Sequence, residues 1–397
     1  MRIERFDMER TQCLYENEVR FNLSESGVQP LSAAELLDRG ADDDGALLSR
    51  PLKYPEANGS RLLRERIAAA YEGADADNVL VTTGTSEANY TTLWGLLEKG
   101  DRVAVMIPCY LQTRGLARAY GAGADPYSLV ETGEGASRRW ALDVDSLRRA
   151  VGARTRVVVV TNPNNPAGSV LTDEEMREIV RAARRVGAWI VSDEVYRGAE
   201  VAGEPESPSF WGRYSRVIVT SGLSKAFGLP GLRIGWIVGP AKTVARLWGY
   251  QDYTTLTPSL LSDRLARAAL EPARRAWILE RTRRILRRQL PVVLDWVARR
   301  EGVLDLVPPR AGAISLVRYR LPLGSVALFE RLREEESVLI TPGAHFGVGK
   351  WFRVGYGYDP ETLTAGLARL GAWIDRVRRE KPRPSGLGTR RRQARAL

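Results

Sequence analysis

The sequence predicts an α/β protein: a large domain with a mostly parallel sheet between helices, joined to a smaller α/β domain. Three observations lead to this prediction. Apolar, β-branched runs alternate with helical stretches from about residue 60 to 240, polar motifs follow those runs, and the character of the chain changes after about residue 257. With 397 residues, the chain suits two domains better than one small core.

The apolar runs of the first part predict strands that are buried on both faces of a sheet. They are VLVTT (79–83), RVAVMIP (102–108), RVVVVTNP (156–163), WIVSDE (189–194), RVIVTSG (216–222) and IGWIVG (234–239). Ligands bind at the carboxyl ends of strands in such sheets. The motifs TTGTSEA, TNPNNPAG, SDEVY and SGLSK stand at these ends, so we expect the functional site there.

The second part of the chain predicts a smaller domain. An Arg-rich helical region (about 258–300) leads to short strands near 303–308, 312–318 and 337–340, and an amphipathic helix follows at 360–379. We expect a large domain over 46–270 and a small domain formed by 1–45 and 271–380. Residues 381–397 are rich in Pro, Gly and Arg, which cannot build a core, and predict a disordered basic tail.

The composition excludes several classes of function. Two cysteines, Cys13 and Cys109, argue against a disulfide framework, and the single histidine, His345, argues against metal sites and Ser-His-Asp hydrolases. The net charge is +11, but six basic residues and no acids lie in the tail, so we expect no nucleic-acid partner. A charged N-terminus and no long apolar stretch predict a cytoplasmic protein without a membrane partner.

The strongest motif is SGLSKAFGLPGLRIGW, residues 221–236. Lys225 directly follows a predicted strand, where partial desolvation would favour a neutral amine that can condense with an aldehyde. Arg233 can return its guanidinium to the same cavity after the turn at Pro230. Asp193 ends another apolar strand, and a buried aspartate requires a cationic partner.

Two further motifs predict anion binding. In TTGTSEAN (82–89), the backbone N–H groups of Thr85 and Ser86 at a helix start can face a phosphate. In WFRVGYG (351–357), Arg353 means little by itself in an arginine-rich chain, although its guanidinium can form a bidentate fork that lysine cannot. Each motif is weak alone, and their order and spacing carry the interpretation.

Taken together, the motifs resemble the class I/II aminotransferases, which are pyridoxal 5'-phosphate (PLP) enzymes of fold type I. The resemblance extends from about Phe21 to Arg378. It implies PLP bound as a Schiff base to Lys225, with Asp193 paired to the ring nitrogen. It also implies that Asn165 and Tyr196 share the phenolic oxygen of the cofactor. Lys225, Asp193 and Tyr196 are therefore the predicted catalytic residues.

The same resemblance assigns the remaining contacts. Thr85, Ser86, Ser224 and Arg233 are expected at the cofactor phosphate, and Tyr110 is expected to stack on the ring. Gly222 stands where relatives often have Ser or Thr, so the phosphate is expected to use Ser221 or Ser224 instead. Tyr54 would reach the phosphate of a neighbouring subunit, which predicts a homodimer. Arg353, the backbone at Gly27 and Asn165 are expected to bind the substrate.

This constellation predicts an aminotransferase that moves the amino group of an L-amino acid to a 2-oxo acid, with Lys225 as general base and acid. The segment NLSESGVQPLS (22–32) departs from the usual pattern and is similar to capreomycidine synthase and PLP-dependent arginine oxidases. An alternative is therefore a biosynthetic lyase, cyclase or oxidase that acts on an arginine-like amino acid. The pocket near Glu16, Glu25 and Gln29 would decide.

Two observations weigh on these alternatives. The oxidases have a histidine near the position of Gln29, so the glutamine argues against oxidation. A third hypothesis, a PLP-sensing transcription regulator, needs a helix-turn-helix domain that the residues before Phe21 do not provide.

Overall fold

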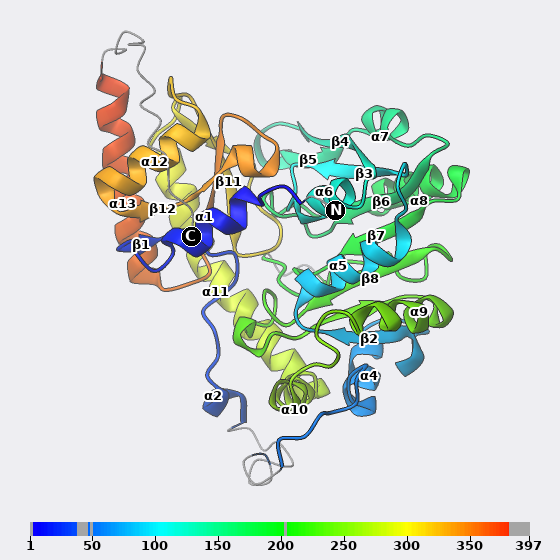
Figure 1. Cartoon of the computed structure of the whole chain (residues 1–397). Helices are drawn as coiled ribbons and strands as arrows, with labels where there is room; N and C mark the ends of the chain where they lie inside the picture. The colour runs from blue at the N-terminus through cyan, green and yellow to red at the C-terminus, as the bar shows by residue number, and fades with distance from the viewer. Residues whose placement is uncertain (1–2, 38–46, 48–50, 202–204, 381–397) are drawn as a thin grey trace, which may run out of the picture.

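A large central sheet organises the chain (Figure 1). The computed structural model describes residues 3–37, 47, 51–201 and 205–380, so the predicted tail and the predicted domain boundary at 45/46 lie outside the described residues. Within the described ranges, eight strands form this sheet. In spatial order they are β2 (Val79–Thr82), β9 (Gly235–Val238), β8 (Val217–Gly222), β7 (Trp189–Asp193), β6 (Thr155–Thr161), β3 (Arg102–Ile107), β4 (Gly123–Thr132) and β5 (Arg139–Leu142).

The sheet is mostly parallel, as predicted. Strands β8, β7, β6, β3 and β4 pair in parallel, whereas β9 and the edge strand β5 run antiparallel to their neighbours. Strand β6 explains why the sequence reads as a continuous apolar run. Val158 and Val160 point into one hydrophobic core, and Val157 and Val159 point into the core on the other face.

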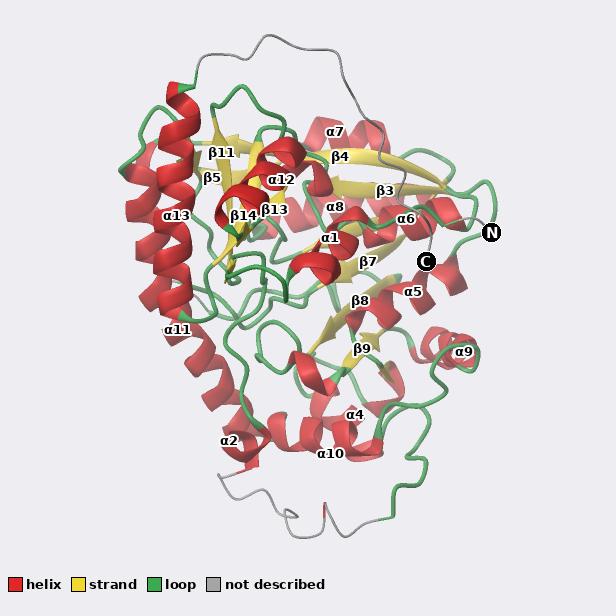
Figure 2. Cartoon of the chain, turned by 60° about the vertical axis from the view of Figure 1, so that its left-hand side comes forward, coloured by secondary structure: helices red, strands yellow, loops and turns green. Residues whose placement is uncertain are grey.

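Helices cover both faces of the sheet (Figure 2). Helices α4 (Arg61–Ala68), α7 (Val144–Ala150) and α8 (Asp173–Val186) pack on one face, and α5 (Thr85–Leu96), α6 (Gln112–Ala119) and α9 (Ala241–Gln251) pack on the other. Helix α8 shows how sequence sets such an element. Thr172 and Glu175 form a capping box at its start, and Gly187 ends it in the left-handed conformation at φ 69°.

Two smaller sheets lie beside the large one. In the described residues, β10 (Leu304–Leu306), β11 (Ile314–Tyr319), β14 (Trp351–Gly355) and β13 (Thr341–Pro342) form an antiparallel sheet, and β1 (Phe21–Asn22) pairs in parallel with β12 (Val338–Leu339). The N-terminal residues therefore fold back onto the C-terminal part of the chain. Helices α1 (Asp7–Tyr15), α12 (Ser325–Glu336) and α13 (Pro360–Arg379) pack around these sheets.

One long helix connects the two parts of the molecule. Helix α11 (Pro272–Ala298) contacts α10 (Leu260–Ala269) near the large sheet, and it contacts β10 and α13 beside the smaller sheets (Figures 1 and 2). The short helix α2 (Ala33–Leu37) packs on α10. The division into domains 46–270 and 1–45 with 271–380 stays a prediction.

The sequence prediction of the strands was incomplete. Strands β4 and β5 were missed because β4 lies near the edge of the sheet, contains Pro126, and mixes buried with exposed residues rather than forming an apolar run. By contrast, the predicted helix at 360–379 matches α13. No helix of the described residues is long and apolar enough to cross a membrane.

Candidate active site

The ends of the central strands bring the predicted residues together. Asp193 is the last residue of β7, and the adjacent parallel strand β8 ends at Gly222, three residues before Lys225. The two side chains are close enough for the charge of Lys225 to lower the pKa of Asp193, against the larger effect of burial. The two motifs therefore lie close together at the ends of adjacent parallel strands.

Lys225 is half-buried, and its Nζ donates a hydrogen bond to Ser26 Oγ at 2.8 Å. Burial lowers the pKa of this lysine, and the positive charge of Arg353 lowers it further, against the opposing charges of Glu25 and Glu9. No carboxylate of the described residues forms an ion pair with it. The amine is thus shifted toward its neutral, nucleophilic form.

Asp193 is a buried carboxylate, 8% exposed, that lacks an ion-pair partner among the described residues. One oxygen accepts a hydrogen bond from Val195 N at 3.1 Å, and Asn89 Nδ2 lies 3.5 Å from the other. Burial raises the pKa of Asp193 to about 6. A cation placed against it would remove this desolvation penalty.

Tyr196 lies three residues after Asp193 and is 2% exposed. Its hydroxyl lies near Ser26 but forms no hydrogen bond of good geometry with a described group, and burial raises its pKa to about 12 against the nearby charge of Arg353. A Cβ atom at Gly312 would lie 3.0 Å from the Tyr196 ring, so a larger residue at Gly312 would displace this phenol. A buried hydroxyl without a partner in a tightly packed setting indicates a place for a ligand atom.

Arg353 on β14 is completely buried. Its guanidinium donates to Asn165 Oδ1 at 2.9 Å, to the Ser24 carbonyl at 2.6 Å and to Thr341 Oγ1 at 3.2 Å. Its Nε is buried without a partner. Because Asn165 accepts from Arg353 through its oxygen, its amide nitrogen remains available as a donor.

The start of α5 lies against Arg233. Gly84 precedes the helix at φ 80°, and a Cβ atom there would collide with the Arg233 guanidinium. A Cβ at Gly222 would lie 2.6 Å from Thr85 Oγ1, so a larger residue at this position would displace the Thr85 hydroxyl. Thr85 Oγ1 is buried without a partner, and the neighbouring Ser86 is exposed. Helix start, guanidinium and free hydroxyl form an anion cradle.

The other residues that the sequence predicted for the site are Ser221, Ser224, Tyr110 and Tyr54. Ser221 Oγ donates a hydrogen bond to the Glu194 carbonyl at 3.2 Å. The Ser224 carbonyl lies close to Gly27, 3.3 Å from where a Cβ atom of residue 27 would be. Tyr110 is half-buried, and its hydroxyl donates to Glu9 Oε1 of α1 at 2.8 Å. Tyr54 is 81% exposed and takes no part in the site of its own chain.

These groups fit PLP. The unpaired carboxylate of Asp193 matches a protonated ring nitrogen, the unpaired Tyr196 hydroxyl matches the phenolic oxygen, and the cradle at Thr85 and Arg233 matches a phosphate. The amine of Lys225 lies among them and matches an aldehyde.

Sequence reasoning missed three residues of this site: Ser26, Glu9 and Asn89. Asn89 could have been predicted from the sequence, because it lies four residues after Thr85 and therefore on the same face of α5. Its Oδ1 accepts a hydrogen bond from Thr220 Oγ1 at 2.7 Å. Ser26 stands next to the predicted Gly27 and was overlooked. Glu9 carries no local signal, because its partner Tyr110 lies 101 positions away.

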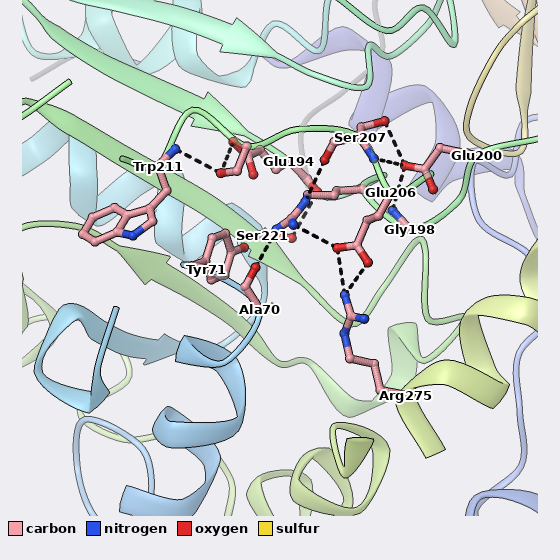
Figure 3. Close-up of polar contacts among 12 residues, drawn as sticks. Ala70, Tyr71, Glu194, Gly198, Glu200, Glu206, Ser207, Trp211, Ser221 and Arg275 are labelled. Atoms are coloured by element: carbon pink, nitrogen blue, oxygen red, sulfur yellow. Dashed lines mark hydrogen bonds and ion pairs between the residues drawn. The ribbon is translucent and has the colours of Figure 1, made fainter. Parts of the chain in front are cut away.

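A network of buried carboxylates holds the chain segment after β7 (Figure 3). Glu194 Oε1 accepts from Ser192 Oγ, Ser209 Oγ and Phe210 N at 2.9–3.0 Å. Glu200 accepts from Gly198 N and Ser207, and it pairs with Arg283 of α11 at 2.7 Å. These contacts fix the backbone on both sides of Tyr196 from behind the site.

The fold and the site define a PLP-dependent enzyme of fold type I. The family model for aminotransferase class I and II matches residues 22–370, and the chain belongs to this family. PLP is its cofactor.

Relatives with different activities resemble the chain. It is 33% identical over 380 residues to capreomycidine synthase from Streptomyces vinaceus, covering 93% of both chains. A PLP-dependent aminotransferase from Streptococcus suis 89-1591 superposes with a TM-score of 0.87 at 29% identity, over 96% of this chain and 100% of the other. The PLP-dependent cyclase OrfR superposes at 0.84 with 28% identity, over 95% and 98%.

Proposed function

We propose that the protein is an aminotransferase that moves the amino group of an L-amino acid to a 2-oxo acid. One observation carries the proposal: Asp193 and Lys225 lie at the ends of adjacent parallel strands, and Arg353, which Asn165 and the Ser24 carbonyl hold in place, comes from the smaller sheet. Together with Tyr196, three residues after Asp193, they offer the groups that this reaction requires. Similarity to the Streptococcus suis aminotransferase supports it.

The buried side chains would hold the reactants. Arg353 would clamp the α-carboxylate of the substrate beside Gly27 and Asn165, since its guanidinium is already oriented by three acceptors. Asp193 would pair with the cofactor ring nitrogen, while Tyr196 and the Asn165 amide would donate to the phenolic oxygen. Thr85, Ser86, Ser224 and Arg233 would bind the phosphate, and Tyr110 would pack on the ring.

PLP, when bound, supplies an electron sink for the negative charge that develops at the substrate α-carbon. Lys225 Nζ would move the proton. As a neutral amine it would take the proton from the substrate α-carbon, and as an ammonium it would return that proton to a carbon of the cofactor. The pKa of Lys225, which burial lowers, favours the neutral amine that takes the proton.

The test is a screen of L-amino acids with purified holoenzyme, without and with a 2-oxo acid acceptor. Transamination predicts a stoichiometric half-reaction that yields pyridoxamine phosphate and one 2-oxo acid, and turnover only when the acceptor is present. Turnover that releases ammonia, or that forms a cyclic product, without any acceptor would reject transamination.

A second candidate is a cyclase or lyase acting on an arginine-like amino acid, and a specific observation favours it. Glu9 and Glu25 are near enough to raise the pKa of both Lys225 and Arg353, and Glu16 is near enough to feel the charge of Lys225. None of the three acids forms an ion pair among the described residues. Burial and the charges of Glu25 and Glu9 raise the pKa of Glu16. Because Arg353 would pair with the α-carboxylate of the substrate, it would no longer neutralise these three acidic side chains. A cationic side chain on the substrate would then supply the charge that pairs with them.

Similarity to capreomycidine synthase and OrfR supports this candidate. The same screen separates the two, provided that it includes arginine and hydroxylated arginine derivatives. A cyclase predicts a product that retains the α-amino nitrogen and loses water, without pyridoxamine phosphate. An oxidase would consume oxygen, and Gln29 argues against that outcome.

The active unit is further proposed to be a homodimer. Tyr54 and its neighbour Leu52 are about four-fifths exposed, at 81% and 79%, and Tyr253 is equally exposed at 81%. Large exposed side chains of this kind indicate an interface, in which Tyr54 would reach the partner's phosphate. Sedimentation analysis of the holoenzyme tests the dimer, and a monomeric active enzyme would reject it.

A further inference from the structure

The ε-amino group of Lys225 has a side-chain partner that neither the motifs nor the family resemblance assigned. Lys225 Nζ donates to Ser26 Oγ at 2.8 Å, across 199 positions of sequence. Ser26 is 5% exposed, so bulk water competes little for its hydroxyl. Within the described chain, this is the hydrogen bond that fixes the amine.

The backbone on both sides of Ser26 is tied to the smaller sheets. Leu23 N donates to the Leu339 carbonyl at 2.8 Å, and the Leu23 carbonyl accepts from Gly355 N at 2.8 Å. The Ser24 carbonyl accepts from Arg353 at 2.6 Å. Beyond Ser26, Gln29 N donates to the Gly357 carbonyl at 2.7 Å. The hydroxyl is therefore positioned by a fixed backbone.

The next residue brings this backbone close to the lysine. A Cβ atom at Gly27 would lie 3.3 Å from the Ser224 carbonyl and 3.9 Å from Lys225 Cδ. A side chain at this position would crowd the Ser224 carbonyl, so glycine allows the segment to pass close to the backbone beside the lysine. Ser26 thus approaches Nζ from the small-sheet side, the side that also carries Arg353.

We propose that Ser26 is a positioning residue, which holds the free ε-amino group of Lys225 and orients it toward the reacting carbon. The inference rests on the proposed function in one respect, namely that Lys225 is the reactive amine. A lysine has four rotatable side-chain bonds, and fixing its end removes conformations that cannot react. Whenever Nζ is not bonded to the cofactor, the hydrogen bond to Ser26 restricts the Lys225 side chain to conformations in which Nζ points toward Ser26.

The test measures how fast apoenzyme captures PLP, which requires attack of the free Lys225 amine on the aldehyde. Stopped-flow absorbance follows the capture across pH 6–10. For Ser26→Ala we expect a plateau rate about 10-fold lower, since one hydrogen bond and its orientation are lost. Ser26→Thr keeps the hydroxyl and should stay within about 3-fold of the parent.

The pH profile provides a readout that a loss of packing would not move. A hydroxyl that accepts from Nζ favours the ammonium form, so Ser26→Ala should shift the midpoint of the profile to lower pH. The charged groups that face the amine are unchanged in this variant. They are Glu9, Glu16, Glu25, Asp193, Arg233 and Arg353.

Two controls separate the possible failures. Ser146→Ala removes another buried serine, on α7, and should capture PLP like the parent. Lys225→Ala should not bind PLP covalently. Covalent capture of PLP by this variant would reject the proposed function. If Lys225→Ala is inert but Ser26→Ala matches the parent in rate and midpoint, or Ser26→Thr is as slow as Ser26→Ala, only the role of Ser26 is overturned.

Discussion

Two regions meet at the active site, and they were built differently. The strand-end site (Thr85, Asp193, Tyr196 and Lys225) lies on the central sheet, where parallel strands force the motifs together. The N-terminal cover (residues 6–29) reaches the same site from outside the large sheet and contributes Glu9, Glu16, Glu25 and Ser26. The first region contains the groups that we propose to hold and use PLP, whereas the second contains charges that only some substrates would match.

The comparison predicts that the largest losses come from the strand-end site. Replacing Lys225 with Ala should lower turnover by at least about 10³-fold, since it removes both the covalent anchor and the proton-transfer group. Steady-state assays with the best substrate of the amino-acid screen measure this. Lys242→Ala, an exposed lysine at the start of α9, serves as control and should be fully active. Substantial turnover by Lys225→Ala would contradict the assignment.

Asp193→Asn should separate function from stability. We expect turnover to fall by about 10²-fold or more because the amide cannot pair as an anion with the ring nitrogen. The apoenzyme should become more stable. Burial raises the pKa of Asp193 to about 6 from 3.8, so its ionisation costs the folded state roughly 1–3 kcal/mol above pH 6.

The sign of this effect is testable with pH. A folded-state pKa above the unfolded value means that parent stability falls as pH rises from about 4 to 6, whereas the Asn variant lacks this contribution. Urea unfolding of the two apoenzymes at pH 4 and pH 8 should therefore show a stability gap that widens at the higher pH. An equal gap at both pH values would mean that Asp193 is not desolvated as described.

The two regions also differ in how far the sequence predicted them. The strand ends were predictable because apolar runs are local patterns, and each motif follows its own strand. The cover was not, since the Glu9–Tyr110 contact spans 101 positions and the Ser26–Lys225 contact spans 199. Neither contact leaves a trace in periodicity or propensity. The missed strand β4 also depends on tertiary structure, because its mixed burial reflects its place next to the edge strand β5.

Changing the cover should alter substrate choice rather than the chemistry. For Glu16→Gln we expect the KM for arginine or its hydroxylated derivative to rise about 10-fold, with little change for an uncharged amino acid of similar length. Kinetics with such a substrate pair measure the ratio. Glu18→Gln, an exposed neighbour two residues away, is the matched control. Equal effects on both substrates would remove the argument for a cationic side chain.

The smallest expected effect comes from the network behind the site. Glu200→Gln would place an amide N–H₂ group against Arg283 while leaving an oxygen for Gly198 N and Ser207, so we expect a loss of about 1–2 kcal/mol in unfolding free energy and a few-fold weaker PLP binding. Urea unfolding and PLP titration measure both. Glu206→Gln breaks the neighbouring pairs with Arg275 and Arg197, which are partly exposed, and should cost less than about 1 kcal/mol. If Glu200→Gln loses activity as severely as Asp193→Asn, the network takes part in the chemistry directly, and the separation between supporting and reacting residues at this strand end would have to be redrawn.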